Sequence, residues 1–274
     1  MRIAVVAPSS RFDDWREVEA RVADLAARSH PGAQVRFHPQ CGLVDHHFAG
    51  TDEERAAALV EVANDPGVDA IWFARGGYGS NRIAERALAE LGPAARDKAW
   101  LGYSDAGFLL AGLYRAGYAN VAHGPMPRDI VKRGGEAAVG LALDWLVRRA
   151  PGALEGGLEP GQRHAAFNVT VLGMLLGTPL EPDLAGHVLL LEEVAEHMYA
   201  TDRALFHIGA SPNVRGAAGI RLGRVSAVLP NDPPFGHDEE AVVRDWCGRA
   251  GIPYLGRADI GHDSGNKVVP FGLL

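Results

Sequence analysis

The sequence is poor in cysteine, in positive charge and in long apolar runs, and each scarcity excludes a class of protein. Two cysteines in 274 residues, Cys41 and Cys247, are too few for a disulfide framework, and we expect both thiols to be reduced. The 27 Lys and Arg are outnumbered by 34 Asp and Glu, giving a formal net charge of −7. Because binding to phosphates needs a basic patch, this balance argues against nucleic acid as a main partner.

No apolar stretch reaches the roughly 18 residues that cross a bilayer, so we expect no membrane partner. The N-terminal run Met1–Pro8 lacks the longer apolar region and the small-residue cleavage site of a signal peptide. It is more typical of a first β-strand. We therefore predict a cytoplasmic location.

The first half of the chain alternates short apolar runs with segments of helical periodicity, which predicts a parallel sheet with helices on its faces. Thr51 and Glu54 have the spacing of a capping box and mark one helix start. We expect an N-terminal, flavodoxin-like α/β domain over residues 1–150. Its predicted strands are 3–8, 34–38, 69–74, 100–103 and 120–122, and its predicted helices are 15–29, 51–64, 81–91, 106–116 and 136–149.

The pattern changes after residue 150. Residues 150–162 are rich in Gly and Pro without periodicity, which predicts a connection between domains. The segments that follow are shorter and more strand-like, and they predict a smaller, β-rich C-terminal domain over residues 165–274. Its predicted strands are 167–171, 187–191, 223–228, 254–257 and 267–270, and its predicted helices are 200–208 and 239–250.

Ser104 is the first candidate for chemistry. The stretch Ala99-Trp-Leu-Gly-Tyr-Ser-Asp-Ala-Gly has the shape of a strand, a sharp turn and a helix. A serine on such a turn stands near a helix N-terminus, where backbone N–H groups stabilise negative charge, as a nucleophile requires. The usual Gly-x-Ser-x-Gly pattern is incomplete, because residue 106 is Ala.

The glycine-rich run Ala74-Arg-Gly-Gly-Tyr-Gly-Ser follows a predicted strand and precedes a predicted helix. Its glycines allow backbone N–H groups to approach an anion. The spacing does not match the dinucleotide pattern Gly-x-Gly-x-x-Gly. Two interpretations remain: an oxyanion cradle beside Ser104, since both loops end parallel strands, or a tight turn without a ligand.

Glu192 and His262 are candidates to assist Ser104. Glu192 directly follows a buried apolar run, where a carboxylate is costly unless it has a partner, although a solvated strand end would also fit. His262 stands between Gly and Asp in a loop and is a candidate general base, with His123 as its main competitor. The adjacent His46 and His47 lack further ligands at metal-binding spacing, so we favour a solvated loop and no metal site.

These segments together resemble the LD-carboxypeptidase family of serine peptidases, which includes murein tetrapeptide carboxypeptidases and microcin-immunity hydrolases. The resemblance spans nearly the whole chain, and its specificity comes from short motifs in the right order. They are Val6-Ala-Pro-Ser-Ser, the glycine-rich run from Ala74, Gly102-Tyr-Ser-Asp, His123-Gly-Pro-Met, Leu191-Glu-Glu with Tyr199 and Asp202-Arg203, and Gly261-His262 followed by Pro270-Phe-Gly.

The resemblance implies an active site between the two domains. It implies Ser104 as nucleophile, His262 as general base and Glu192 as the residue that orients it. The backbone N–H groups of Gly77 and Asp105 would then form the oxyanion hole. The resemblance implies no metal or organic cofactor, and a homodimer as the common assembly.

The function implied is release of a C-terminal D-amino acid, D-Ala, from a muropeptide during peptidoglycan recycling. A cation is needed for the terminal carboxylate, and the candidates are Arg75, beside Gly76, and Arg203. Two alternatives stay open: hydrolysis of a peptidyl-nucleotide or another acylated small molecule, and non-catalytic binding of a muropeptide or nucleotide.

The chain departs from the family pattern twice near the expected substrate site. Ala166-Phe-Asn stands where the family usually has Gly-Gly-Asn, and Leu191-Glu-Glu stands where it has Leu-Glu-Asp. These changes bear on the substrate more than on the class of reaction.

Overall fold

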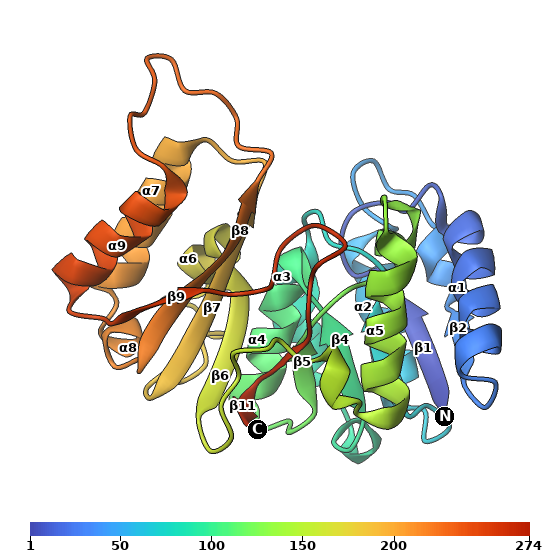
Figure 1. The fold of residues 1–274 in the computed structure, drawn as a ribbon. Coiled ribbons are helices and arrows are strands. Elements are labelled where there is room, and N and C mark those ends of the chain that lie inside the picture. Colours follow the sequence, from blue (N-terminus) through green and yellow to red (C-terminus); the bar gives the residue numbers. More distant parts are fainter.

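The computed structural model describes all residues 1–274 and contains two β-sheets, each with its own helices (Figure 1). The first sheet has the strand order β10-β5-β4-β3-β1-β2. Five of these strands come from the first half of the chain and are parallel. They are β1 (Arg2–Val6), β2 (Gln34–Phe37), β3 (Ala70–Phe73), β4 (Ala99–Gly102) and β5 (Val121–His123).

The five helices of this half cover both faces of the first sheet. They are α1 (Trp15–Ser29), α2 (Asp52–Asn64), α3 (Ser80–Ala89), α4 (Gly107–Arg115) and α5 (Gly135–Arg148). Successive residues of β1 point to opposite faces: Ile3 packs in a cluster with α1 and α5, whereas Ala4 packs in a cluster with α2, α3 and α4. The sheet is therefore buried on both sides, as a parallel sheet requires.

Local signals begin several of these elements. The Thr51 hydroxyl accepts a hydrogen bond from the Glu54 N–H at 3.2 Å, and the Glu54 carboxylate accepts one from the Thr51 N–H at 2.8 Å. This confirms the capping box at the start of α2. Short 3₁₀ turns join other elements: η1 (Pro39–Gly42), η2 (Pro93–Ala95), η3 (Ser104–Ala106), η4 (Pro127–Val131) and η5 (Pro151–Ala153).

The second sheet has the order β11-β6-β7-β8-β9. Its four longer strands are parallel: β6 (Arg163–Asn168), β7 (His187–Val194), β8 (Gly219–Ser226) and β9 (Tyr254–Arg257). Four helices belong to this half: α6 (Val169–Leu175), α7 (Met198–Ala210), α8 (Pro212–Arg215) and α9 (Glu239–Ala250). The apolar residues of α6, α7 and α9 share one cluster with α4, so the two halves have a continuous core.

The far end of the chain returns to the first sheet. Residues 258–268, here called the crossing segment, leave β9 and lead to β10 (Val269–Pro270), which pairs antiparallel with β5 (Figure 1). The chain then adds β11 (Gly272–Leu273) to the edge of the second sheet beside β6. Ala258 and Ile260 of the crossing segment pack with Val188 and Leu190 of β7.

Three sequence expectations need correction. The predicted strand 167–171 ends at Asn168, whose side chain accepts a hydrogen bond from the Val171 N–H at 3.1 Å and begins α6. The predicted strand 267–270 joins the first sheet rather than the C-terminal one. The predicted strand 223–228 begins earlier, at Gly219, and ends at Ser226. Residues 150–162 lead from α5 to β6, and buried Glu155 anchors them by pairing with Arg221 at 2.7 Å.

Cys41 and Cys247 are both buried and unpaired, and burial raises the pKa of their thiols to about 12 and about 11. None of the helices combines the length and the apolar character that a bilayer crossing requires.

Candidate active site

Three loops meet where strands β1, β3 and β4 end. The Ser10 hydroxyl accepts a hydrogen bond from the Tyr78 N–H at 3.0 Å, and the Ser9 hydroxyl donates one to the Asp105 carboxylate at 2.5 Å. Parallel strands present their carboxyl ends at one edge of a sheet, so segments far apart in sequence converge there. The Pro-Ser-Ser, glycine-rich and Tyr-Ser-Asp motifs form one structural unit at this edge.

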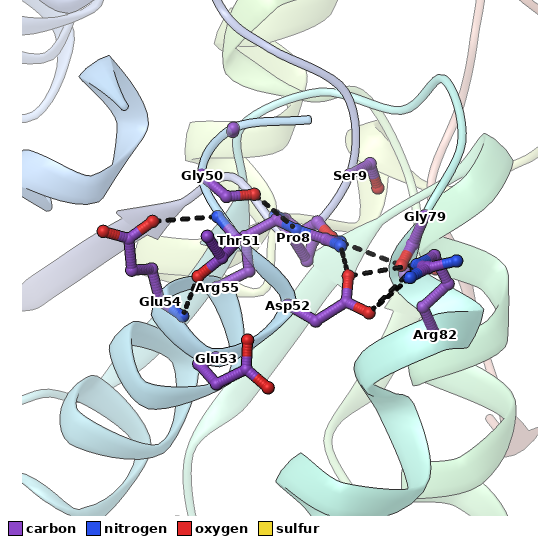
Figure 2. A network of polar contacts seen from close by, with 12 residues as sticks. Pro8, Ser9, Gly50, Thr51, Asp52, Glu53, Glu54, Arg55, Gly79 and Arg82 are labelled. Atoms are coloured by element: carbon purple, nitrogen blue, oxygen red, sulfur yellow. Dashed lines mark hydrogen bonds and ion pairs between the residues drawn. The ribbon is translucent and has the colours of Figure 1, made fainter. Parts of the chain in front are cut away.

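A buried arginine, Arg55, connects the loops of this unit to one another. The Arg55 side chain is inaccessible to solvent, donates to the carbonyls of Pro8, Gly79 and Gly50, and pairs with Asp52 (Figure 2). A guanidinium presents several donors in a rigid plane, which suits it to joining separate loops. Arg55 thereby fixes the loop after β1 relative to the loop after β3.

Ser104 adopts the geometry of a nucleophile elbow. Its φ of +59° lies in the left-handed region, which is costly for a residue with a Cβ and is typical of functional turns. Ala106 has a φ of −60°, an ordinary helical value that needs no glycine. The incomplete Gly-x-Ser-x-Gly motif is therefore compatible with the elbow, because the strained residue is Ser104 itself.

Close approach explains one glycine of the loop beside Ser104. A Cβ at Gly76 would lie 2.8 Å from the Ser104 Oγ. The next residue, Gly77, has a φ of +110°, which L side chains rarely adopt, and its N–H makes no hydrogen bond within the protein. The loop thus leaves a free backbone donor near the serine.

The side chain of Asp105 points away from the cavity that its backbone borders. Its carboxylate accepts hydrogen bonds from the N–H groups of Ser80 at 2.9 Å and Gly79 at 3.3 Å, at the N-terminus of α3. A carboxylate is favourable at a helix N-terminus. Asp105 therefore fixes the turn through its side chain, and only its backbone is available to a ligand at Ser104.

Ser104, His262 and Glu192 form a chain of hydrogen bonds. The His262 Nε2 lies 3.0 Å from the Ser104 Oγ, and its Nδ1 lies 2.6 Å from the Glu192 Oε2. Glu192 is fully buried beside an irregularity in the β7–β8 pairing, and His262 belongs to the crossing segment. If Nδ1 carries the proton that Glu192 accepts, Nε2 is free to accept the serine proton.

A network from the first half of the chain holds the backbone of His262. The Lys132 ammonium donates to the His262 carbonyl at 3.0 Å and to the Tyr103 hydroxyl at 3.1 Å, and it pairs with Asp129 at 2.7 Å. The Tyr103 ring lies 4.8 Å from the His262 ring. Burial, followed by Asp129, raises the pKa of Tyr103, which keeps the phenol protonated as a donor.

His123, the competing candidate base, occupies a different place. It is buried, and its Nε2 lies 3.2 Å from the Oδ1 of Asn266, which also accepts the Gly261 N–H at 3.2 Å. Burial lowers the pKa of His123 to about 4, so the ring is neutral near pH 7. It contacts the crossing segment and makes no hydrogen bond to Ser104.

Two cavities meet at Ser104. The first, of about 590 Å³, contains the carboxylates of Glu85, Glu193 and Glu196 and no basic side chain. The second, of about 540 Å³, contains Arg75, Arg128, Lys132 and His262. Gly77 and Val194 border both. Ser104 thus lies between an acidic compartment and a basic one.

Of the two departures from the family pattern, only Glu193 borders the acidic cavity, and it contacts Asn168, the residue that keeps the family's Asn in the other segment. The Asn168 side chain donates to Glu193 at 2.6 Å, and the Thr170 hydroxyl donates to the same carboxylate at 2.8 Å. Burial raises the pKa of Glu193 despite these donors. Asn168 and Glu193 are therefore a structural pair that shapes the cavity wall.

The remaining sequence candidates lie apart from one another. Arg75 and Gly76 border the basic cavity. Arg203 lies exposed on α7, its guanidinium 5.6 Å from the Tyr199 ring centre, and borders neither cavity. His47 contacts Ser10 at 2.9 Å, whereas His46 is almost fully exposed.

Sequence reasoning missed Lys132 and Arg128, which follow the His123-Gly-Pro-Met motif. Lys132 acts on a backbone carbonyl 130 residues away, and no side-chain pattern records such a contact. A basic residue on the loop after β5 is the one signal available, since that loop ends at the same sheet edge as Ser104.

A two-domain α/β fold with a serine elbow and a Ser–His–Glu chain defines a hydrolase of the serine type. Comparison with known families makes this specific. Residues 3–124 match the LD-carboxypeptidase N-terminal domain and residues 164–274 match the LD-carboxypeptidase C-terminal domain, so the chain belongs to the LD-carboxypeptidase family.

Two curated relatives cover nearly the whole chain. A Bacillus subtilis protein named "Probable murein peptide carboxypeptidase" is 30% identical, covering 98% of this chain and 86% of its own length. The murein tetrapeptide carboxypeptidase of Pseudomonas aeruginosa is 26% identical, covering 99% and 91%.

Solved structures show the same fold at lower identity. The muramoyltetrapeptide carboxypeptidase of Oxalobacter formigenes has a TM-score of 0.79 at 24% identity, covering 99% of this chain and 93% of that one. The microcin self-immunity protein MccF, in complex with aspartyl sulfamoyl adenosine, has a TM-score of 0.82 at 19% identity, covering 99% and 91%.

Proposed function

We propose that this protein is a serine carboxypeptidase that hydrolyses an L,D amide bond and releases D-Ala from a muropeptide tetrapeptide. The observation that carries the proposal is the Ser104–His262–Glu192 chain at the junction of two cavities. Family membership and the names of the two curated relatives support murein peptides as the substrate class.

In the proposed reaction the Ser104 Oγ attacks the carbonyl carbon of the scissile amide while His262 Nε2 accepts the serine proton. His262 then gives this proton to the leaving nitrogen, the C–N bond breaks, and D-Ala departs from an acyl-enzyme. Water, deprotonated by His262, then attacks the ester. The bond between the Ser104 Oγ and the acyl carbon breaks, His262 returns the proton to the Oγ, and the shortened peptide leaves with a new carboxylate. Buried Glu192 fixes the imidazole tautomer and stabilises the imidazolium.

The oxyanion formed in each attack is assigned to the N–H groups of Gly77 and Asp105. The free Gly77 N–H and the position of Asp105 directly after the nucleophile support this assignment. Loss of one such donor costs about 3–4 kcal/mol of transition-state stabilisation in comparable hydrolases. The mechanism calls on no metal or organic cofactor.

We further propose that the protein acts in the cytoplasm, in peptidoglycan recycling, and as a homodimer. Exposed apolar side chains, among them Tyr199 and Phe206 on α7, support an association surface. Light scattering on the purified protein measures the assembly directly: a mass near twice 29.1 kDa is expected, and a monomer at micromolar concentration contradicts the dimer.

The experiment that tests the function is incubation with a murein tetrapeptide and mass-spectrometric detection of D-Ala, with Ser104→Ala alongside. Release by the wild type and its loss in the variant are expected. The likeness to MccF makes an aminoacyl sulfamoyl nucleoside the matched second substrate. Cleavage of that compound without D-Ala release would transfer the assignment to an acyl-nucleotide hydrolase, and turnover of neither would favour a binding protein.

A further inference from the structure

Of the three cationic side chains Arg75, Arg128 and Lys132 that line the basic cavity, only Arg75 has no ion-pair partner. Lys132 pairs with Asp129, and Arg128 pairs through its Nε with Asp14 at 3.1 Å. Arg75 is half-buried and has no carboxylate partner: its guanidinium donates to the carbonyls of Arg11 at 2.6 Å and Gly76 at 3.2 Å. An unpaired, partly desolvated guanidinium beside a nucleophile favours an anionic ligand.

The two arginines also act on each other. Burial, followed by repulsion from Arg128, lowers the pKa of Arg75. The nearby carboxylates of Asp14 and Asp13 oppose this shift without cancelling it, so a further anion beside the two guanidiniums is favourable. The Arg75 Nη2 lies 3.6 Å from the position that a Cβ on Gly77 would occupy, so its unused N–H groups are close to the proposed oxyanion donor.

The position of His262 independently indicates which cavity holds the leaving residue of the substrate. His262 borders the basic cavity and not the acidic one. The general acid must reach the leaving nitrogen, so the leaving residue lies on the side of His262. In a carboxypeptidase that residue carries the free carboxylate, which Glu85 and Glu196, neither of which has an ion-pair partner, would repel from the other cavity.

We propose that Arg75 and Arg128 bind the terminal carboxylate of the substrate, which places the leaving residue in the basic cavity and the acyl part in the acidic one. This inference rests on the proposed function and adds a determinant of exopeptidase specificity. Lys132 is excluded from this role because its ammonium already contacts Asp129, the Tyr103 hydroxyl and the His262 carbonyl.

The test compares a tetrapeptide ending in D-Ala with the same peptide ending in D-alaninamide, measured as kcat/KM for each. We expect the kcat/KM of the wild type to be at least about tenfold higher for the peptide ending in D-Ala, because the amide peptide cannot make the charge-assisted contact. Arg128→Gln is expected to lower kcat/KM for the acid about ten- to hundredfold and to leave the amide nearly unchanged. Arg128→Lys keeps the charge without the planar fork, so an intermediate ratio is expected.

Arg244→Gln is the matched control, since Arg244 lies exposed on α9 and pairs with Glu240. It should keep the wild-type ratio, and thermal unfolding of each variant shows whether the fold is intact. Hydrolysis of both peptides with a ratio that Arg128 does not affect would overturn the inference alone. Hydrolysis of neither by wild type would overturn the proposed function, and the inference with it.

Discussion

The loop that carries Ser104 and the crossing segment that carries His262 obtain their positions in different ways. Ser104 follows β4 directly, and its strained turn is held by neighbours on the same sheet edge. His262 lies 158 residues further along the chain and contacts both Ser104, after β4, and Glu192 of β7. Ser104 is thus positioned by local turn chemistry, whereas His262 is positioned by tertiary packing.

Among the residues that support Ser104 and His262 without reacting themselves, Glu192 should have the largest effect when it is changed. Glu192→Gln keeps the shape of the side chain but removes the charge that orients and stabilises His262. We expect kcat to fall about 10⁴-fold, as for the analogous change in other triads.

A KM within about threefold and an unchanged unfolding temperature would show that the loss is chemical. A fall of less than tenfold in kcat would contradict the role given to Glu192.

Lys132 is a positioning residue of the crossing segment, and Lys132→Met should break its hold on the His262 carbonyl. We expect kcat to fall about ten- to hundredfold, because outer contacts that orient a reacting group have effects of this size. The fall should be equal for peptides ending in D-Ala and in D-alaninamide. This equality separates Lys132 from Arg128.

Lys132→Arg is the companion variant and should recover part of the activity by restoring a donor near the carbonyl. Acid-selective loss in Lys132→Met would instead assign Lys132 to carboxylate binding.

His123 makes the stability of the crossing segment depend on pH, since it supports this segment as a neutral ring. Its pKa is about 4 when folded, below the ordinary 6.5, so the unfolded chain binds the extra proton more readily. The stability that neutral His123 provides is present above pH 6.5 and is lost as pH falls toward 4.

Between pH 7 and pH 5 this coupling amounts to about 2 kcal/mol of unfolding free energy. Urea unfolding of wild type and His123→Gln measures it: the variant should be less stable at pH 7 and should lose less stability on acidification. Parallel pH curves for the two proteins would contradict this account of His123.

The same contrast explains which features could be predicted from the sequence. Helix α1 begins and ends at the predicted Trp15 and Ser29, and the capping box at Thr51 is present, because periodicity and capping act over a few residues. Asn168 was hidden in an apolar run that resembled a strand. The pairing of Val269 with His123 joins segments separated by most of the second domain, and no local pattern encodes it.

The residues of the candidate site also differ in how well they could be predicted from the sequence. Ser104, Glu192 and His262 were found together through family motifs, and the structure brings them into hydrogen-bonding distance. Arg203 carried a motif but borders neither cavity, whereas Arg128 carried no predicted role and borders the basic one. Sequence motifs thus located the residues of the hydrogen-bonded chain, but only some of the residues that line the two cavities.

Ser104 and His262, from two differently built regions, should act as one unit in the proposed reaction. A double-mutant cycle on D-Ala release measures this directly, using Ser104→Ala, His262→Ala and the double variant. We expect each single change to lower kcat by about 10⁶-fold and the double change to cost little more, as in coupled triads. Independent, multiplicative losses, or a His262→Ala variant that retains full activity, would contradict it.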